Sequence, residues 1–103
     1  MNEIQQLTRR IAEEFNPKRV ILFGSYAYGR PRKDSDVDLL VEMRYTGNAL
    51  RQSARILRRI RPRCALDILV ISPSEIRSRL REDDWFIADI IEKGRLLYEK
   101  RHK

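Results

Sequence analysis

Three aspartates carry the clearest chemical signal in the sequence. Asp36 and Asp38 are two residues apart in the run DVDLLV, and Asp67 interrupts the apolar run ALDILVI. Residues i and i+2 of a strand point to the same face, so the first two carboxylates are expected side by side. Neighbouring carboxylates repel each other at neutral pH, and exposure, a basic partner or a divalent cation relieves that repulsion.

Asp67 strengthens the interpretation as a cation site. An ionised side chain without partners is costly inside an apolar strand. If this strand pairs beside the strand of Asp36 and Asp38, three carboxylates share one face, and hard cations such as Mg²⁺ or Mn²⁺ prefer these oxygen ligands. The pattern predicts a two-metal site, which stabilises the attacking and leaving oxygens of a phosphoryl transfer.

Each acid also has a simpler interpretation. Asp34 to Asp36 is compatible with an ordinary turn into a strand. Asp67 is compatible with a structural ion pair to an arginine of the preceding helix. The nearby Gly24-Ser25 pair favours the metal site over these alternatives.

A glycine and a small hydroxyl residue follow the first apolar run. The run RVILF ends at Gly24-Ser25, and Gly29 comes shortly after. Backbone amides at such a turn can bind an anion, and the Ser25 hydroxyl can donate to a phosphate. A P-loop is excluded because Arg30-Pro31 stands where Lys-Ser/Thr is required. A calcium loop is excluded because Leu39 occupies the glycine position.

Alternating strands and helices are expected to position these groups. Apolar residues at three- and four-residue steps predict helices, and β-branched apolar runs predict strands. The helices are expected over residues 3–15, 46–60, from Ser72-Pro73 onward, and 83–93; the strands over 19–23, 36–41, 65–71 and 95–98. This order predicts one α/β or α+β domain over residues 1–103, with a basic tail from about 99. Its small mixed sheet should have three to four strands, with helices packed mainly on one face.

Composition limits the classes of protein. The chain has 103 residues, which is one domain's worth, and enough apolar residues for a core. No apolar run of signal-peptide or membrane length occurs near the start, so we expect a cytoplasmic protein without membrane association. Cys64 is the single cysteine, which excludes an internal disulfide and a cysteine-based zinc site. The net charge of +7 favours nucleotides, RNA or an acidic protein surface as partners.

Three motifs in order resemble a known superfamily. They are LFGS at 22–25, DVDL at 36–39 and LDI at 66–68. The pattern resembles the nucleotidyltransferases related to DNA polymerase β, and among them the minimal nucleotidyltransferases, some of which are antitoxins. The resemblance implies that Asp36 and Asp38 bind two Mg²⁺ ions, with Mn²⁺ as the alternative metal. It also implies that Asp67 completes the site of the ion that activates the attacking hydroxyl.

The same resemblance implies a nucleotide-binding segment. Gly24 and Ser25 would hold the triphosphate of ATP. Tyr28 stands where the family often has an arginine, so Arg30, Arg32 or Lys33 is expected to supply the positive charge. The expected nucleotide-binding residues are Gly24, Ser25, Gly29, Arg30 and Lys33.

The family implies a function and leaves alternatives. Many minimal nucleotidyltransferases are encoded with a HEPN-domain ribonuclease toxin and neutralise it by transferring AMP from ATP to a tyrosine, with release of pyrophosphate. One alternative is nucleotidyl transfer to a small molecule such as an aminoglycoside. Another is a non-catalytic module that binds a toxin or RNA, although direct RNA binding is not favoured. A homodimer and a hetero-oligomer with the toxin both stay open.

Two further features have a structural and a functional interpretation. Six arginines lie on the second long helix and at its end. They would form either a surface that binds a partner or a helix face exposed to solvent. They are Arg51, Arg55, Arg58, Arg59, Arg61 and Arg63. Trp85 and Phe86 are expected to anchor a partner or to pack in the core.

Overall fold

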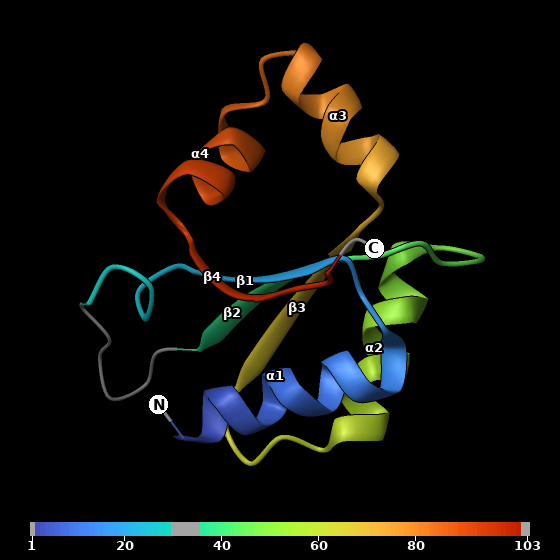
Figure 1. Ribbon diagram of the computed structural model, residues 1–103, viewed down its shortest axis with the longest axis vertical. Coiled ribbons are helices and arrows are strands. Elements are labelled where there is room, and N and C mark those ends of the chain that lie inside the picture. Colours follow the sequence, from blue (N-terminus) through green and yellow to red (C-terminus); the bar gives the residue numbers. More distant parts are fainter. Residues whose placement is uncertain (1, 30–35, 102–103) are drawn as a thin grey trace.

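The fold contains every helix and strand that the sequence predicts. The computed structural model describes residues 2–29 and 36–101 (Figure 1). The elements in chain order are α1 (Asn2–Phe15), β1 (Arg19–Phe23), β2 (Val37–Glu42), α2 (Ala49–Ile60), β3 (Leu66–Ile71), α3 (Pro73–Arg81), α4 (Trp85–Lys93) and β4 (Arg95–Glu99). The predicted boundaries differ from these by three residues or fewer. The prediction of a small α/β domain with a mixed sheet is confirmed.

The strands form one four-stranded sheet in the order β3-β2-β1-β4. β1 pairs with β2 and with β4 in antiparallel fashion, whereas β2 and β3 run parallel. Parallel neighbours need a crossover connection, and α2 provides it between β2 and β3. The sheet end at which β1 stops and β2 and β3 start therefore gathers residues from three strands.

Helices cover both faces of the sheet, which corrects the expectation that they pack mainly on one face. α1 and α2 lie on one side and α3 and α4 on the other (Figure 1). Consecutive residues Leu39, Leu40 and Val41 are all fully buried, the first and third against the α1 side and Leu40 against the α3 side. A strand that is apolar on both faces needs cover on both. The larger core lies on the α1 and α2 side.

Short polar signals define the helix boundaries. The Asn48 side chain accepts a hydrogen bond from the backbone N–H of Arg51 and starts α2, three residues later than predicted. The Ser72 hydroxyl caps α3 by accepting from the N–H of Glu75, with Pro73 at the first helical position. The Asp84 carboxylate caps α4.

A buried ion pair stabilises the pairing of β1 with β2. Glu42 is 2% exposed, and its carboxylate accepts from the Arg19 Nε at 2.5 Å. Arg19 and Glu42 are direct partners at one end of the antiparallel pair, and Phe23 and Asp38 are partners at the other end. The pairing that buries Glu42 therefore also places Phe23 beside Asp38.

Candidate active site

The three aspartates lie at the same end of the sheet. Asp38 in β2 is the direct partner of Asp67 in β3. Both side chains are on the face covered further along by α3 and α4, because Leu40 and Ile71 of the same strands pack there. Asp36 immediately precedes β2 and is exposed, as is Asp67, whereas Asp38 is half-buried. The expectation that the strand of Asp67 pairs beside that of Asp38 is confirmed.

The Asp38 carboxyl is affected by its surroundings. Burial raises its pKa above the ordinary value, and the negative charges of Asp67 and Asp36 raise it further. The three acids therefore interact electrostatically across two strands. A carboxylate that is disfavoured by its neighbours is typical of a functional site, where repulsion is relieved by a ligand.

Gly24 allows the turn after β1 to approach Asp38. Its φ is +74°, a left-handed conformation that glycine adopts readily. A Cβ added there would overlap the Asp38 Oδ2 atom and would lie 3.3 Å from the Asp38 Cγ atom. The carbonyl of Gly24 accepts from the N–H groups of Ala27 at 3.1 Å and Tyr28 at 3.3 Å. Glycine is thus required here both for its conformation and for the space beside Asp38.

The remaining expected nucleotide-binding residues divide into two groups. Ser25 is half-buried in the turn next to Gly24, and Gly29 ends the described part of that turn with a φ of +73°. Arg30 and Lys33 lie outside the described residues, as does Arg32. Gly24 lies beside Asp38, and Ser25 follows it in the same turn.

Asp89 of α4, which belongs to no motif in the sequence, contacts the turn after β1. The Tyr28 hydroxyl donates to the Asp89 carboxylate at 3.3 Å, and Asp89 pairs with Lys93 at 3.2 Å. Burial raises the pKa of the Tyr28 hydroxyl, and the charge of Asp89 adds to the effect. The four-residue spacing of Asp89 and Lys93 predicts their helical ion pair, but no local pattern links it to Tyr28.

The carboxylates suit a hard divalent cation in their chemistry. Aspartate oxygens from two strands, with Gly24 leaving space beside them, offer the ligands that Mg²⁺ and Mn²⁺ prefer. Among residues 2–29 and 36–101, no three acidic, histidine or cysteine side chains are already drawn together as a ligand set. Mutual repulsion among uncompensated carboxylates favours such separation. The donor types therefore fit a cation that would draw the side chains inward.

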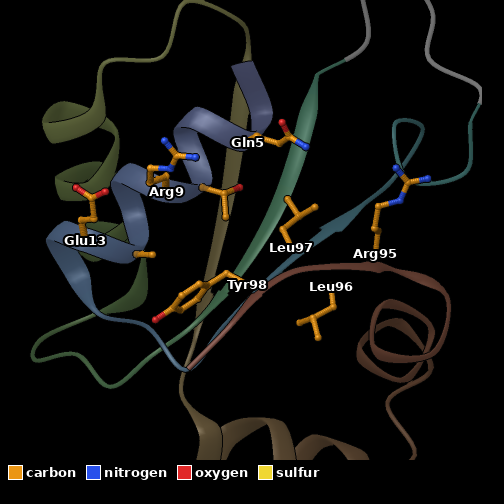
Figure 2. Close-up of a pocket in the computed structure, with 9 residues that line it drawn as sticks. Gln5, Arg9, Glu13, Arg95, Leu96, Leu97 and Tyr98 are labelled. Carbon is orange, nitrogen blue, oxygen red and sulfur yellow. The ribbon is translucent and has the colours of Figure 1, made fainter. Parts of the chain in front are cut away.

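A separate hollow on the molecule lacks this chemistry. It has a volume of about 820 Å³ and lies between α1 and β4 (Figure 2). Arg9 and Glu13 line it from α1, and Leu97 and Tyr98 from β4. Its single carboxylate comes from Glu13, so it offers no converging acids for phosphoryl transfer.

Within the described part of the chain, no helix is both long enough and apolar enough to cross a membrane.

Comparison with protein families decides the identity of the domain. The family described as "Polymerase beta, Nucleotidyltransferase" matches residues 5–103. The chain belongs to this nucleotidyltransferase family. The match includes the Gly24-Ser25 turn and all three aspartates.

One curated relative has a more specific name. A Methanocaldococcus jannaschii protein named putative protein adenylyltransferase is 33% identical over 55 residues. The aligned segment covers 50% of this nucleotidyltransferase chain and 64% of the relative.

Two solved structures share the nucleotidyltransferase fold. A Sulfolobus solfataricus protein described as a putative nucleotidyltransferase superposes with a TM-score of 0.66 at 20% identity, covering 96% of this chain and 79% of that one. A structure described as a toxin-antitoxin with AMP-PNP superposes with a TM-score of 0.61 at 17% identity, covering 98% of this chain and 76% of that one. At these identities the likeness concerns the fold.

Gly24→Ala should destabilise the fold more than Gly47→Ala. Both glycines have positive φ values, +74° and +81°, so alanine costs about 1–2 kcal/mol at either position. The new Cβ at position 24 meets Asp38, whereas nothing described lies within 4 Å at position 47. Displacing Asp38 should add about 1–3 kcal/mol. Urea unfolding measures the free energy of unfolding of both variants. Equal losses of that free energy would contradict the close approach of Gly24 to Asp38.

Asp38→Asn should stabilise the metal-free protein at neutral pH. The pKa of the Asp38 carboxyl is raised in the folded state. The proton on this carboxyl therefore adds to the free energy of unfolding at pH values below the unfolded-state pKa, and this stabilisation is lost as pH rises through the folded-state pKa. At pH 7 the ionised carboxylate therefore opposes folding, and the amide removes that effect. Urea unfolding in EDTA should give Asp38→Asn a higher free energy of unfolding than the wild type at pH 7, and the difference should shrink toward pH 4.

The exposed Glu13 provides the control for this comparison. Glu13→Gln also removes one negative charge but lies on α1, away from the aspartates. It should show no comparable gain at pH 7. A wild-type protein more stable than Asp38→Asn at pH 7 would refute the electrostatic argument.

Proposed function

We propose that this domain transfers AMP from ATP to a tyrosine hydroxyl of a HEPN-domain toxin and acts as the toxin's antitoxin in the cytoplasm. The observation that carries the proposal is the direct pairing of Asp38 with Asp67 beside the Gly24 turn. Membership of the nucleotidyltransferase family supports the reaction class. The name of the curated relative supports a protein acceptor, and the toxin-antitoxin structure with AMP-PNP supports an ATP-like donor and a toxin partner.

In this proposal the aspartates hold Mg²⁺. Asp36, Asp38 and Asp67 supply carboxylate oxygens from β2, its preceding residue and β3. When bound, the cation would neutralise charge on the phosphates and lower the pKa of the attacking hydroxyl. The electrostatic repulsion that raises the pKa of Asp38 would be relieved at the same time.

The turn after β1 orients the donor nucleotide. Backbone N–H groups near Gly24 and the hydroxyl of Ser25 would bind the triphosphate, and Gly29, Arg30 and Lys33 would extend this contact along the segment. Gly24 keeps the turn close enough to Asp38 for one nucleotide to reach both. The triphosphate is thereby held in line for attack at its α-phosphorus.

The transfer balances without a further reactant. The acceptor oxygen forms a bond to the α-phosphorus while the bond from that phosphorus to the bridging oxygen of the β-phosphate breaks. The hydroxyl proton leaves to solvent, and pyrophosphate departs with the bonding electrons. The products are an AMP ester of the acceptor and pyrophosphate.

Asp38→Asn should abolish transfer while the protein stays folded. The purified chain is incubated with ATP, Mg²⁺ and the protein encoded beside it, and the intact masses of both proteins are measured. The partner should gain one or more AMP units. Loss of a metal ligand removes several kcal/mol of transition-state stabilisation, so the rate should fall by about 100-fold or more.

Glu13→Gln is the matched control, because it removes a carboxylate outside the site, and it should transfer at the wild-type rate. Full activity of Asp38→Asn would refute the assignment of the aspartates. A variant lacking all three aspartates should lose neutralisation. If it instead neutralises the toxin without any gain in the toxin's mass, the domain acts by contact alone.

A further inference from the structure

Two exposed aromatic residues of α4 have no role in the chemistry described above. Trp85 is 77% exposed and Phe86 is 41% exposed at the start of α4. Large aromatic side chains usually bury most of their surface in a core or against a partner. Their exposure beside a candidate active site therefore points to a ligand.

The two rings continue a line that begins at Asp38. Phe23 is the direct antiparallel partner of Asp38, and paired side chains share a face with Cβ atoms about 4.5–5.5 Å apart. The Phe86 ring contacts the Phe23 ring edge to face at a centroid distance of 6.1 Å. The Trp85 ring contacts the Phe86 ring in the same manner, also at 6.1 Å. Two ring contacts thus connect Trp85 to Phe23, the strand partner of Asp38.

The helix start holds these rings in place. The Asp84 carboxylate accepts from the N–H of Phe86 at 3.0 Å and from the N–H of Ile87 at 3.1 Å. Ile87 is fully buried against the sheet, which anchors the first turn of α4. Trp85 therefore presents an open ring on a rigid base.

We infer that the base of the substrate nucleotide stacks on the Trp85 ring, which the Phe86 ring supports edge to face. This inference rests on the proposed function. A nucleotide whose phosphates bind at Gly24-Ser25 and at the aspartates has its base about one ribose away from them. Phe23, the antiparallel partner of Asp38, leads from the aspartates to Phe86 and Trp85. Every base has a π-face, so stacking on aromatic rings is effective for any nucleotide.

The size of the surface favours a base over a protein partner. The flat surface on offer is the Trp85 indole alone, because the Phe86 ring meets it edge to face. One indole matches the area of one nucleobase, whereas a stable protein interface buries about 800 Å² on each side. The residues just before Trp85 are the acids Glu82, Asp83 and Asp84, of which Glu82 and Asp83 are exposed. A polar rim around a small aromatic surface suits a base with amino groups at its edge. Purines, with two fused rings, should stack better than pyrimidines.

The intrinsic fluorescence of Trp85, the single tryptophan of the chain, reports the contact directly. Mg²⁺-ATP is titrated into the full chain, and Mg²⁺-tripolyphosphate, which has the phosphates without the base, is titrated in parallel. ATP should change the tryptophan emission, and tripolyphosphate should compete with ATP without that change. A dissociation constant for each ligand is then measured calorimetrically in the variants.

Trp85→Ala should raise the Kd for ATP by about 5- to 150-fold, the range expected for loss of one stacked base, and should leave the Kd for tripolyphosphate unchanged. Trp85→Phe, which keeps a ring, should retain most of the affinity. Leu50→Ala is the matched control, because Leu50 is 81% exposed on α2 and lies on the other side of the sheet. It should change neither constant.

Three outcomes would overturn the inference. If Trp85→Ala binds ATP as tightly as the wild type, the base does not stack there, although the proposed function stands. If Trp85→Ala binds ATP normally but loses affinity for the acceptor protein, the rings are a docking surface for that protein. If the wild-type chain binds neither ATP nor tripolyphosphate, the stacking on Trp85 and the proposed function both fail.

Discussion

The parallel contact between β2 and β3 holds two like charges side by side, and the candidate site depends on it. The register pairs Asp38 with Asp67 and continues through apolar pairs such as Leu40 with Leu69. A slip of one residue would turn Asp67 to the opposite face, toward α1 and α2. The apolar pairs and the crossover helix α2 therefore maintain an arrangement that the acids alone would oppose. The apolar pairs further along β2 and β3 stabilise the sheet, and the candidate site lies at the start of these two strands.

The antiparallel contact of β1 with β2 adds the other half of the site. It brings the turn at Gly24 against the Asp38 carboxylate and places Phe23 on the same face. α4 covers this face only in part, so Phe86 contacts Phe23 while Asp67 stays exposed. The chain thus combines a closed two-sided core with an open acidic end. Such local destabilisation is typical of sites that gain stability when a ligand binds.

Much of the fold and part of the site follow from local sequence signals. The strands of Leu22, Leu40 and Val70 are short apolar runs, and Asn48, Ser72 and Asp84 are good helix caps, so the elements could be predicted within a few residues. The spacing of Asp36 and Asp38 implies a shared face in any strand. Cover on both faces of the sheet follows from strands that are apolar on both faces, such as β2. Which helices cover which face could not be predicted, because the apolar runs do not distinguish the two faces.

Contacts between distant residues account for the remaining differences. Gly94 follows the last residue of α4 with a φ of −68° rather than the left-handed value common at helix ends. Its role is spatial, since a Cβ would crowd Ile21 and lie 3.1 Å from the Leu22 carbonyl oxygen. The contact of Tyr28 with Asp89 likewise joins residues 61 positions apart, which no local pattern reveals.

Direct binding of Mn²⁺ tests the central claim that aspartates of two adjacent strands form one cation site. The EPR signal of free Mn²⁺ is followed as wild-type protein, Asp67→Asn and a variant with all three aspartates changed to asparagine are added. The wild type should bind Mn²⁺, Asp67→Asn should bind it with an affinity at least about tenfold lower, and the triple variant should not bind it. Equal binding by the wild type and the triple variant would contradict a shared cation site.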